Sequence, residues 1–131
     1  MIFLIRFPSL KTNWTNAKAI CEEQGGHLFN PDSKQQNDDV AAAAIDEFGD
    51  TDENDYSYYI FLGINDIKEE GVWMQSDGLN ATFFNWFTDN YGDEPDNYEG
   101  NEDCAVQSLY YDDDGWLDIS CHDTHHFVCE I

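Results

Sequence analysis

Basic residues are scarce in this chain. Five Lys and Arg stand against 28 Asp and Glu in 131 residues, which gives a formal net charge of −23 at pH 7. Proteins bind nucleic acid and anionic membrane surfaces through Lys and Arg, so the sequence excludes both as partners. The acidic excess favours cationic partners, namely metal ions, a basic protein or a calcium mineral face. High solubility, or adaptation to salt, is the alternative explanation for most of the charge.

Long apolar runs are also missing. The opening run of residues 1–5 is far shorter than the ~20 residues of a membrane span, so we expect no membrane insertion. It is also too short for the apolar region of a signal peptide, so we interpret it as part of a first strand. Hydrophobic residues still make up 41% of the chain, which predicts a globular fold rather than disorder.

The sequence contains no Cys-x-x-Cys pair, so neither a thiolate zinc site nor a redox motif is expected. It does contain four cysteines at wide spacings: Cys21, Cys104, Cys121 and Cys129. An even number at such spacings predicts two disulfides, formed in an oxidising compartment. We therefore expect a secreted or extracellular protein. The spacing alone leaves the pairing open.

Local patterns predict helices first and strands afterwards, within one domain over residues 1–131. Thr12 is the expected cap of a first helix that ends at Gly25-Gly26, and Ser33 with Gln36 forms a capping box for a second helix that ends at Gly49. Strands are predicted at 2–7, 58–64, 72–75, 104–110, 115–121 and 126–131. Residues 83–103 are rich in Asn, Asp, Gly and Pro and predict a long loop, which is usually functional in a compact domain.

Carboxylates gather in this loop and just after it. Ca²⁺ in proteins binds six to eight oxygens, mostly from carboxylates and carbonyls on several loops. Glu94, Asp96, Glu102 and Asp118 are therefore predicted to bind one Ca²⁺ ion. The alternative is a solvated acidic loop with no ion.

Several motifs occur together in a characteristic order. They are Trp14 seven residues before Cys21, Phe61-Leu-Gly-Ile64, Asn85-Trp86, Glu94-Pro95-Asp96 and the four cysteines. In these features the chain resembles the C-type lectin domain family over nearly its whole length. The resemblance implies disulfides Cys21–Cys129 and Cys104–Cys121. It also implies an α+β fold of the C-type lectin-like type, with two helices, small antiparallel sheets and a long irregular Ca²⁺-binding loop.

The resemblance further implies two Ca²⁺ sites. The principal site, which is also the sugar site, maps onto Glu94, Asp96, Glu102 and Asp118. A second, auxiliary site maps onto Asp66, Glu70, Asn97, Glu102 and Asp103.

Two positions depart from the family pattern. The residue before Asp118, usually Asn, is Leu117 here. The Glu94-Pro95-Asp96 motif matches neither the Glu-Pro-Asn of mannose-type members nor the Gln-Pro-Asp of galactose-type members. The class of sugar therefore stays open.

Two functions remain. The first is a Ca²⁺-dependent lectin for a carbohydrate or glycoconjugate, with ligand-binding residues Glu94, Asp96, Glu102, Asp118, Tyr98 and Asn101. The second is a lectin-like domain with a structural Ca²⁺ that binds a protein, a mineral or an ice surface. No catalytic motif appears, so an enzyme is not expected. The sequence leaves a homo-oligomer open.

Other suggestive residues have simpler explanations. Trp86 and Trp116 are expected in the core rather than in a sugar platform. His122, His125 and His126 lack matching Cys or Asp ligands and are expected to be strand and turn residues rather than a zinc site. The glycosylation sequons begin at Asn13 and Asn80, and Asn80 is the better candidate because it falls in an expected surface loop.

Overall fold

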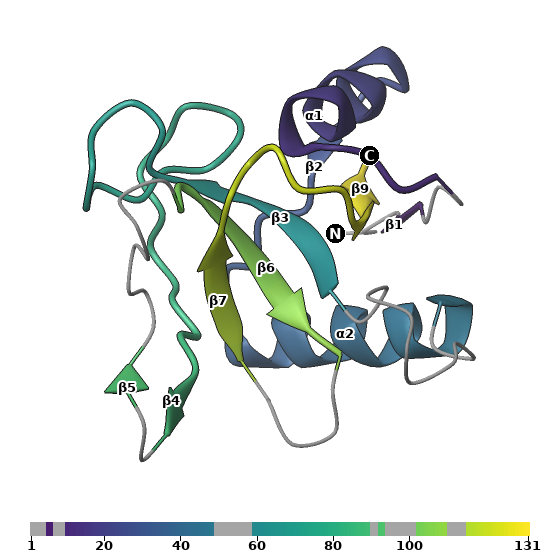
Figure 1. The fold of residues 1–131 in the computed structure, drawn as a ribbon. Coiled ribbons are helices and arrows are strands. Elements are labelled where there is room, and N and C mark those ends of the chain that lie inside the picture. Colours follow the sequence, from purple (N-terminus) through teal and green to yellow (C-terminus); the bar gives the residue numbers. More distant parts are fainter. Residues whose placement is uncertain (1–4, 7–9, 49–58, 90–91, 94–101, 110–114) are drawn as a thin grey trace.

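The structure, a computed structural model, describes residues 5–6, 10–48, 59–89, 92–93, 102–109 and 115–131. These described residues form two helices and three small sheets (Figure 1). In chain order the elements are β1 (Ile5–Arg6), α1 (Trp14–Glu23), β2 (His27–Leu28), α2 (Lys34–Phe48), β3 (Tyr59–Asn65), β4 (Thr88–Asp89), β5 (Gly92–Asp93), β6 (Cys104–Ser108), β7 (Trp116–Ile119), β8 (His126–Phe127) and β9 (Cys129–Glu130). This architecture confirms the predicted α+β class, although β3 and β8 run parallel, so the central sheet is not wholly antiparallel as predicted.

The central sheet has the strand order β7-β6-β3-β8 and separates two hydrophobic clusters. Side chains of a strand alternate between its faces, so one strand can serve both clusters. On β3, Ile60 and Leu62 pack with the apolar side of α2, whereas Phe61 packs with Trp14 and Ala17 of α1. Burial on both faces explains why β3 is a continuous apolar run rather than an alternating one.

The helix starts agree with the predictions in part. Thr12 is not the cap of α1, because its backbone pairs with His125. The cap is Asn13, whose Oδ1 accepts a hydrogen bond of 2.9 Å from the backbone N–H of Asn16. At α2, Ser33 Oγ accepts from the N–H of Gln36 at 3.1 Å, as the capping box predicts.

The two ends of the described chain lie side by side in a sheet of order β1-β9-β2 (Figure 1). The disulfide Cys21–Cys129 joins α1 to β9 across 108 residues, and Cys104–Cys121 joins β6 to the turn after β7. Both predicted pairs are confirmed. The first closes almost the whole chain into one covalent loop.

Two strand predictions and one loop prediction need correction. Residues 72–75 form no strand, because Met74 makes only isolated bridges to Asn65 and Asn80. The last predicted strand is divided into β8 and β9 at Val128, whose carbonyl turns to accept from Phe29 N–H. The predicted loop 83–103 contains a short hairpin, β4–β5. Predictions for residues 2–4, 7, 49–58 and 110 lie outside the described residues.

Candidate functional site

One edge of the central sheet collects the ends of three strands. Because β3 and β7 both run antiparallel to β6, the carboxyl ends of β3 and β7 lie beside the start of β6. Asn65 pairs with Cys104, which in turn pairs with Ile119. The edge is therefore where Asp66 and Asp103 lie, and the N–H of Asp66 donates to the carbonyl of Asp103 at 2.9 Å.

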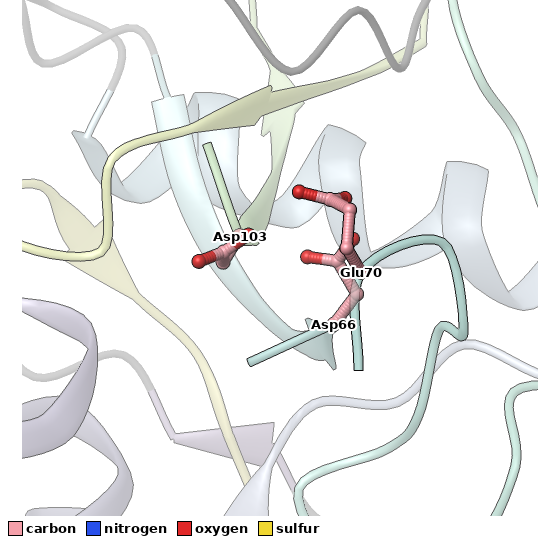
Figure 2. Close-up of side chains that lie close together, drawn as sticks. All are labelled: Asp66, Glu70 and Asp103. Carbon is pink, nitrogen blue, oxygen red and sulfur yellow. The ribbon is translucent and has the colours of Figure 1, made fainter. Parts of the chain in front are cut away.

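Three carboxylates meet at this edge: Asp66, Glu70 and Asp103, which we call the acidic cluster. One ligand oxygen from each lies within 4.8 Å of the others. Figure 2 shows Asp66 and Glu70 rising from the segment after β3, with Asp103 facing them from the start of β6. Ca²⁺–oxygen distances of ~2.3–2.6 Å place oxygens on opposite sides of the ion about 5 Å apart. The spacing of the acidic cluster therefore fits one Ca²⁺ ion.

The turn between β3 and the next segment holds two of these carboxylates in place. The N–H of Gly71 donates to Asp66 Oδ2 at 2.9 Å and to Glu70 Oε2 at 3.1 Å. Gly71 has a φ of +83°, a left-handed conformation that glycine adopts without strain. Sequence reasoning missed the role of Gly71. Its position directly after Glu69-Glu70 was the available signal.

Asp66 is the electrostatic centre of the acidic cluster. Its side chain is 1% exposed, and its Oδ1 has no hydrogen-bond partner among the described residues. Burial, with the nearby carboxyl groups of Glu70 and Asp103, raises the pKa of Asp66 to about 7, although the Gly71 N–H opposes the shift. Three carboxylates around a buried, unpartnered oxygen favour a bound cation, because a cation offsets both the burial cost and the mutual repulsion.

The remaining predicted ligands fall into two groups. Glu102 is partly buried just before Asp103, and Asp118 on β7 is 2% exposed. Within the described residues neither joins a close group of three possible ligands. Glu94, Asp96, Asn97, Tyr98 and Asn101 lie outside the described residues. The principal site therefore stays a prediction, as does the part of the auxiliary site that uses Asn97 and Glu102.

Leu117 lies on β7, where burial alternates. Trp116 and Asp118 are buried, whereas Leu117 and Ile119 are partly buried and pack against the cluster that contains Trp14. The side chain at the position before Asp118 thus contributes to packing. An apolar residue there strengthens the fold but cannot act as a metal ligand.

Trp116 lies in the core, as predicted, whereas Trp86 is partly buried against it and His122 is exposed. Trp116 is fully buried, and Trp86 packs against it edge-on, with 5.6 Å between ring centroids. His126 stacks on Phe48 at 4.0 Å, and His125 is also mostly buried. The buried side chains among these belong to the core of the molecule.

The fold, the two disulfides and the acidic sheet edge together define a C-type lectin-like domain. The profile of the family described as "Lectin C-type domain" matches residues 10–131. The chain belongs to the C-type lectin domain family.

Individual relatives agree with this assignment. The chain is 31% identical over 122 residues to C-type lectin 37Db of Drosophila melanogaster. The match covers 92% of this chain and 72% of that protein. The chain is also 30% identical over 133 residues to Salivary C-type lectin 1 of Aedes albopictus, and the match covers 95% of this chain and 79% of that protein. A third relative is Hemolymph lipopolysaccharide-binding protein of Periplaneta americana, 31% identical over 128 residues, covering 96% of this chain and 48% of that protein.

Solved structures share the fold. The carbohydrate-recognition domain of the mouse scavenger receptor C-type lectin superimposes with a TM-score of 0.77 at 23% identity, covering 100% of this chain and 91% of that one. A calcium-independent type II antifreeze protein superimposes with a TM-score of 0.76 at 19% identity, and the match covers 98% of this chain and 85% of that one. At such identities the likeness shows the fold alone. Neither helix of the described chain is long and apolar enough to cross a membrane.

Proposed function

We propose that residues 1–131 form one extracellular domain that binds Ca²⁺ and, with its help, a carbohydrate or glycoconjugate. The observation that carries the proposal is the buried, unpartnered Oδ1 of Asp66 among three converging carboxylates. Members of the family are generally binding domains rather than enzymes, so we propose no catalysis. The names of the salivary and hemolymph relatives support an extracellular location.

The acidic cluster would hold the first ion. Asp66, Glu70 and Asp103 supply hard carboxylate oxygens, which favour Ca²⁺ or Mg²⁺ over transition metals. Asn97 and Glu102 are proposed as further ligands of this ion. Because Asp66 and Asp103 lie on different strand ends, a shared ion would link the segment after β3 to the start of β6.

The sugar would bind at a second ion held by Glu94, Asp96, Glu102 and Asp118, with contacts from Tyr98 and Asn101. The position of Asp118 supports its role, because it pairs with Ala105 close to the start of β6, directly after the segment that carries Glu102 and Asp103. Carboxylates around such an ion can accept hydrogen bonds from sugar hydroxyl groups.

A glycan array tests the sugar proposal. The protein is applied in millimolar Ca²⁺ and again with excess chelator. Binding to a defined set of glycans in Ca²⁺ that disappears with chelator supports the proposal. Binding that is unchanged by chelator, or absence of binding to any glycan, contradicts it.

The affinity for free monosaccharides is expected to be low. Ionised Asp96 and apolar Leu117 stand where the family supplies two amide donors, and an unmade hydrogen bond at a desolvated site costs about 1–3 kcal/mol. Two such losses correspond to roughly two to three orders of magnitude in Kd. The double substitution Asp96→Asn with Leu117→Asn should strengthen Ca²⁺-dependent mannose binding, measured by calorimetry. Tight mannose or galactose binding by the unmodified protein would contradict this argument.

A second candidate function has one specific observation in its favour. Leu117 is partly buried and packs against a hydrophobic cluster instead of offering an oxygen, so the proposed sugar-binding ion would have one ligand fewer than in the family pattern. The domain would then use a structural Ca²⁺ and bind a protein, a mineral or an ice surface. Stabilisation by Ca²⁺ together with a negative glycan array is the outcome that favours this alternative.

A further inference from the structure

A pocket of about 280 Å³ lies between α1 and the segment that follows β3. Its walls include Trp14 and Lys18 of α1, together with Asn65, Ile67, Lys68 and Met74. None of the three carboxylates of the acidic cluster lines it. The pocket and the acidic cluster are thus two separate sites built on one segment of chain.

The walls of the pocket are mainly apolar. Trp14 contributes ring surface only, because its Nε1–H donates to the carbonyl of Leu62 at 2.8 Å. Asn65 is occupied within its own segment, since its amide donates to the Gly63 carbonyl at 3.0 Å and its Oδ1 accepts from the Ile67 N–H at 3.3 Å. Ile67 is 50% exposed, so water contacts an apolar wall that a ligand would cover with a gain in free energy.

The pocket is lined by two positively charged residues, which are rare in this acidic protein. Lys18 and Lys68 are two of only five basic residues in the chain. Lys18 Nζ also contacts Glu22 Oε1 at 2.7 Å, an exposed pair on the surface of α1. Lys68 has no ion-pair partner among the described residues. Lys18 and Lys68 are the only charged residues among the described residues that line the pocket, so its walls complement a ligand that combines an apolar body with a negative head group.

We propose that this pocket binds a small amphipathic anion, a molecule with an apolar body and a single carboxylate, sulfate or phosphate head group. The apolar body lies against Trp14, Ile67 and Met74, and the head group lies between Lys18 and Lys68. The volume of about 280 Å³ is just below the roughly 300–1,000 Å³ of small-molecule sites, which suits one ring or a short chain.

The net charge of the protein opposes any anion at long range. Screening limits this repulsion, because the Debye length is ~8 Å at physiological ionic strength. At contact distance the charged side chains on the pocket walls are those of Lys18 and Lys68, and no carboxylate is among the described residues that line it. The apolar contact therefore supplies binding, and the head group selects anions over neutral or cationic molecules of the same shape.

Octanoate is the probe that tests the proposal, with octanol and octylammonium as matched neutral and cationic controls. Each is titrated into ¹⁵N-labelled protein, and amide shifts are followed by NMR in Ca²⁺ and in chelator. We expect shifts around the pocket residues, with octanoate binding about tenfold more tightly than octanol and octylammonium most weakly. Shifts spread over the whole surface, or octanol binding as tightly as octanoate, would overturn the proposal.

Two exposed positions separate the head-group contact from the apolar contact. Lys68→Met keeps the apolar stem and should weaken octanoate about tenfold without changing octanol. Ile67→Ser should weaken both probes. Lys34→Met on α2, outside the pocket, is the control and should change neither. A Lys68→Met protein that binds octanoate as before contradicts the proposal. Since no cluster carboxylate lines the pocket, octanoate binding in chelator distinguishes this site from the proposed Ca²⁺ site.

Discussion

At the scale of single residues, Asp66 is the side chain on which the metal proposal can be tested most directly. In Asp66→Asn, the amide oxygen can still accept from Gly71 N–H, and the amide nitrogen can donate to Glu70 or Asp103. The substitution removes a buried charge and one Ca²⁺ ligand together. We expect the Tm in chelator to stay equal or rise, and the Ca²⁺-dependent rise in Tm to fall sharply. Differential scanning calorimetry with and without Ca²⁺ measures both.

The control for that experiment is Asp123→Asn, because Asp123 is an exposed turn residue outside the acidic cluster. It lowers the net negative charge by the same amount and should leave the response to Ca²⁺ unchanged. An unmodified protein whose Tm does not change at millimolar Ca²⁺ would contradict the metal proposal itself.

The carboxyl group of Glu130 should make the free energy of unfolding depend on pH. Its carboxyl lies on β9 opposite His27, is 18% exposed, and has an Oε1 without a partner in the described structure. Burial, with smaller contributions from Asp32 and Asp77, raises the pKa of Glu130 from 4.5 to about 7, although the Asn30 N–H opposes the shift. The folded state therefore holds this proton more tightly than the unfolded state does.

The sign of the effect follows from that difference. The free energy of unfolding should fall as the pH rises from 4.5 to about 7 and should lose nothing further from this group above pH 7. Glutamine does not titrate, so Glu130→Gln should make the fall in the free energy of unfolding between pH 4.5 and 7.5 smaller by about 1–3 kcal/mol. Compared with its difference from the unmodified protein at pH 4.5, the variant should therefore be relatively more stable at pH 7.5. Urea denaturation at pH 4.5 and 7.5 in saturating Ca²⁺ measures it. Parallel pH profiles for the two proteins would show that Glu130 does not titrate in this range.

At the scale of elements, a buried amide joins α2 to the central sheet. Asn37 Nδ2 donates to Gln107 Oε1 on β6 at 3.0 Å, and Asn37 Oδ1 accepts from Trp116 Nε1 on β7 at 2.8 Å. Asn37→Ala leaves two buried polar groups without partners and should lower the free energy of unfolding by about 2–4 kcal/mol. Chemical denaturation is the measurement. Gln35→Ala, on the exposed side of the same helix, should cost less than about 0.5 kcal/mol.

The elements also show where local sequence patterns suffice. The capping box at Ser33 and the apolar run of β3 predicted their elements because each depends on residues a few positions apart. Thr12 failed as a cap because a distant partner, His125, occupies its backbone. Asn37 gave no signal, since an amide in a polar stretch of helix resembles any exposed residue until the sheet packs against it.

At the scale of the whole molecule, the disulfides differ in the length of chain that each closes. Cys21–Cys129 spans 108 residues and Cys104–Cys121 spans 17. On the chain-entropy account, the longer loop contributes about 4–5 kcal/mol and the shorter about 3 kcal/mol. The pair Cys21→Ala with Cys129→Ala should therefore lower the Tm more than Cys104→Ala with Cys121→Ala does. Calorimetry of both double variants in Ca²⁺ tests the order, and the reverse order would contradict the entropic explanation.

The sequence by itself determined, through its ordered motifs, the family, the α+β class and the disulfide pairs. These follow from residue types and spacings that are readable along the chain. The family resemblance already grouped Asp66, Glu70 and Asp103, but only the tertiary structure showed that Asp66 Oδ1 is buried and unpartnered among the described residues, and that Lys18 and Lys68 line one pocket. Strand register and helix packing determine which side chains lie close together. They join residues dozens of positions apart, beyond the reach of any local pattern.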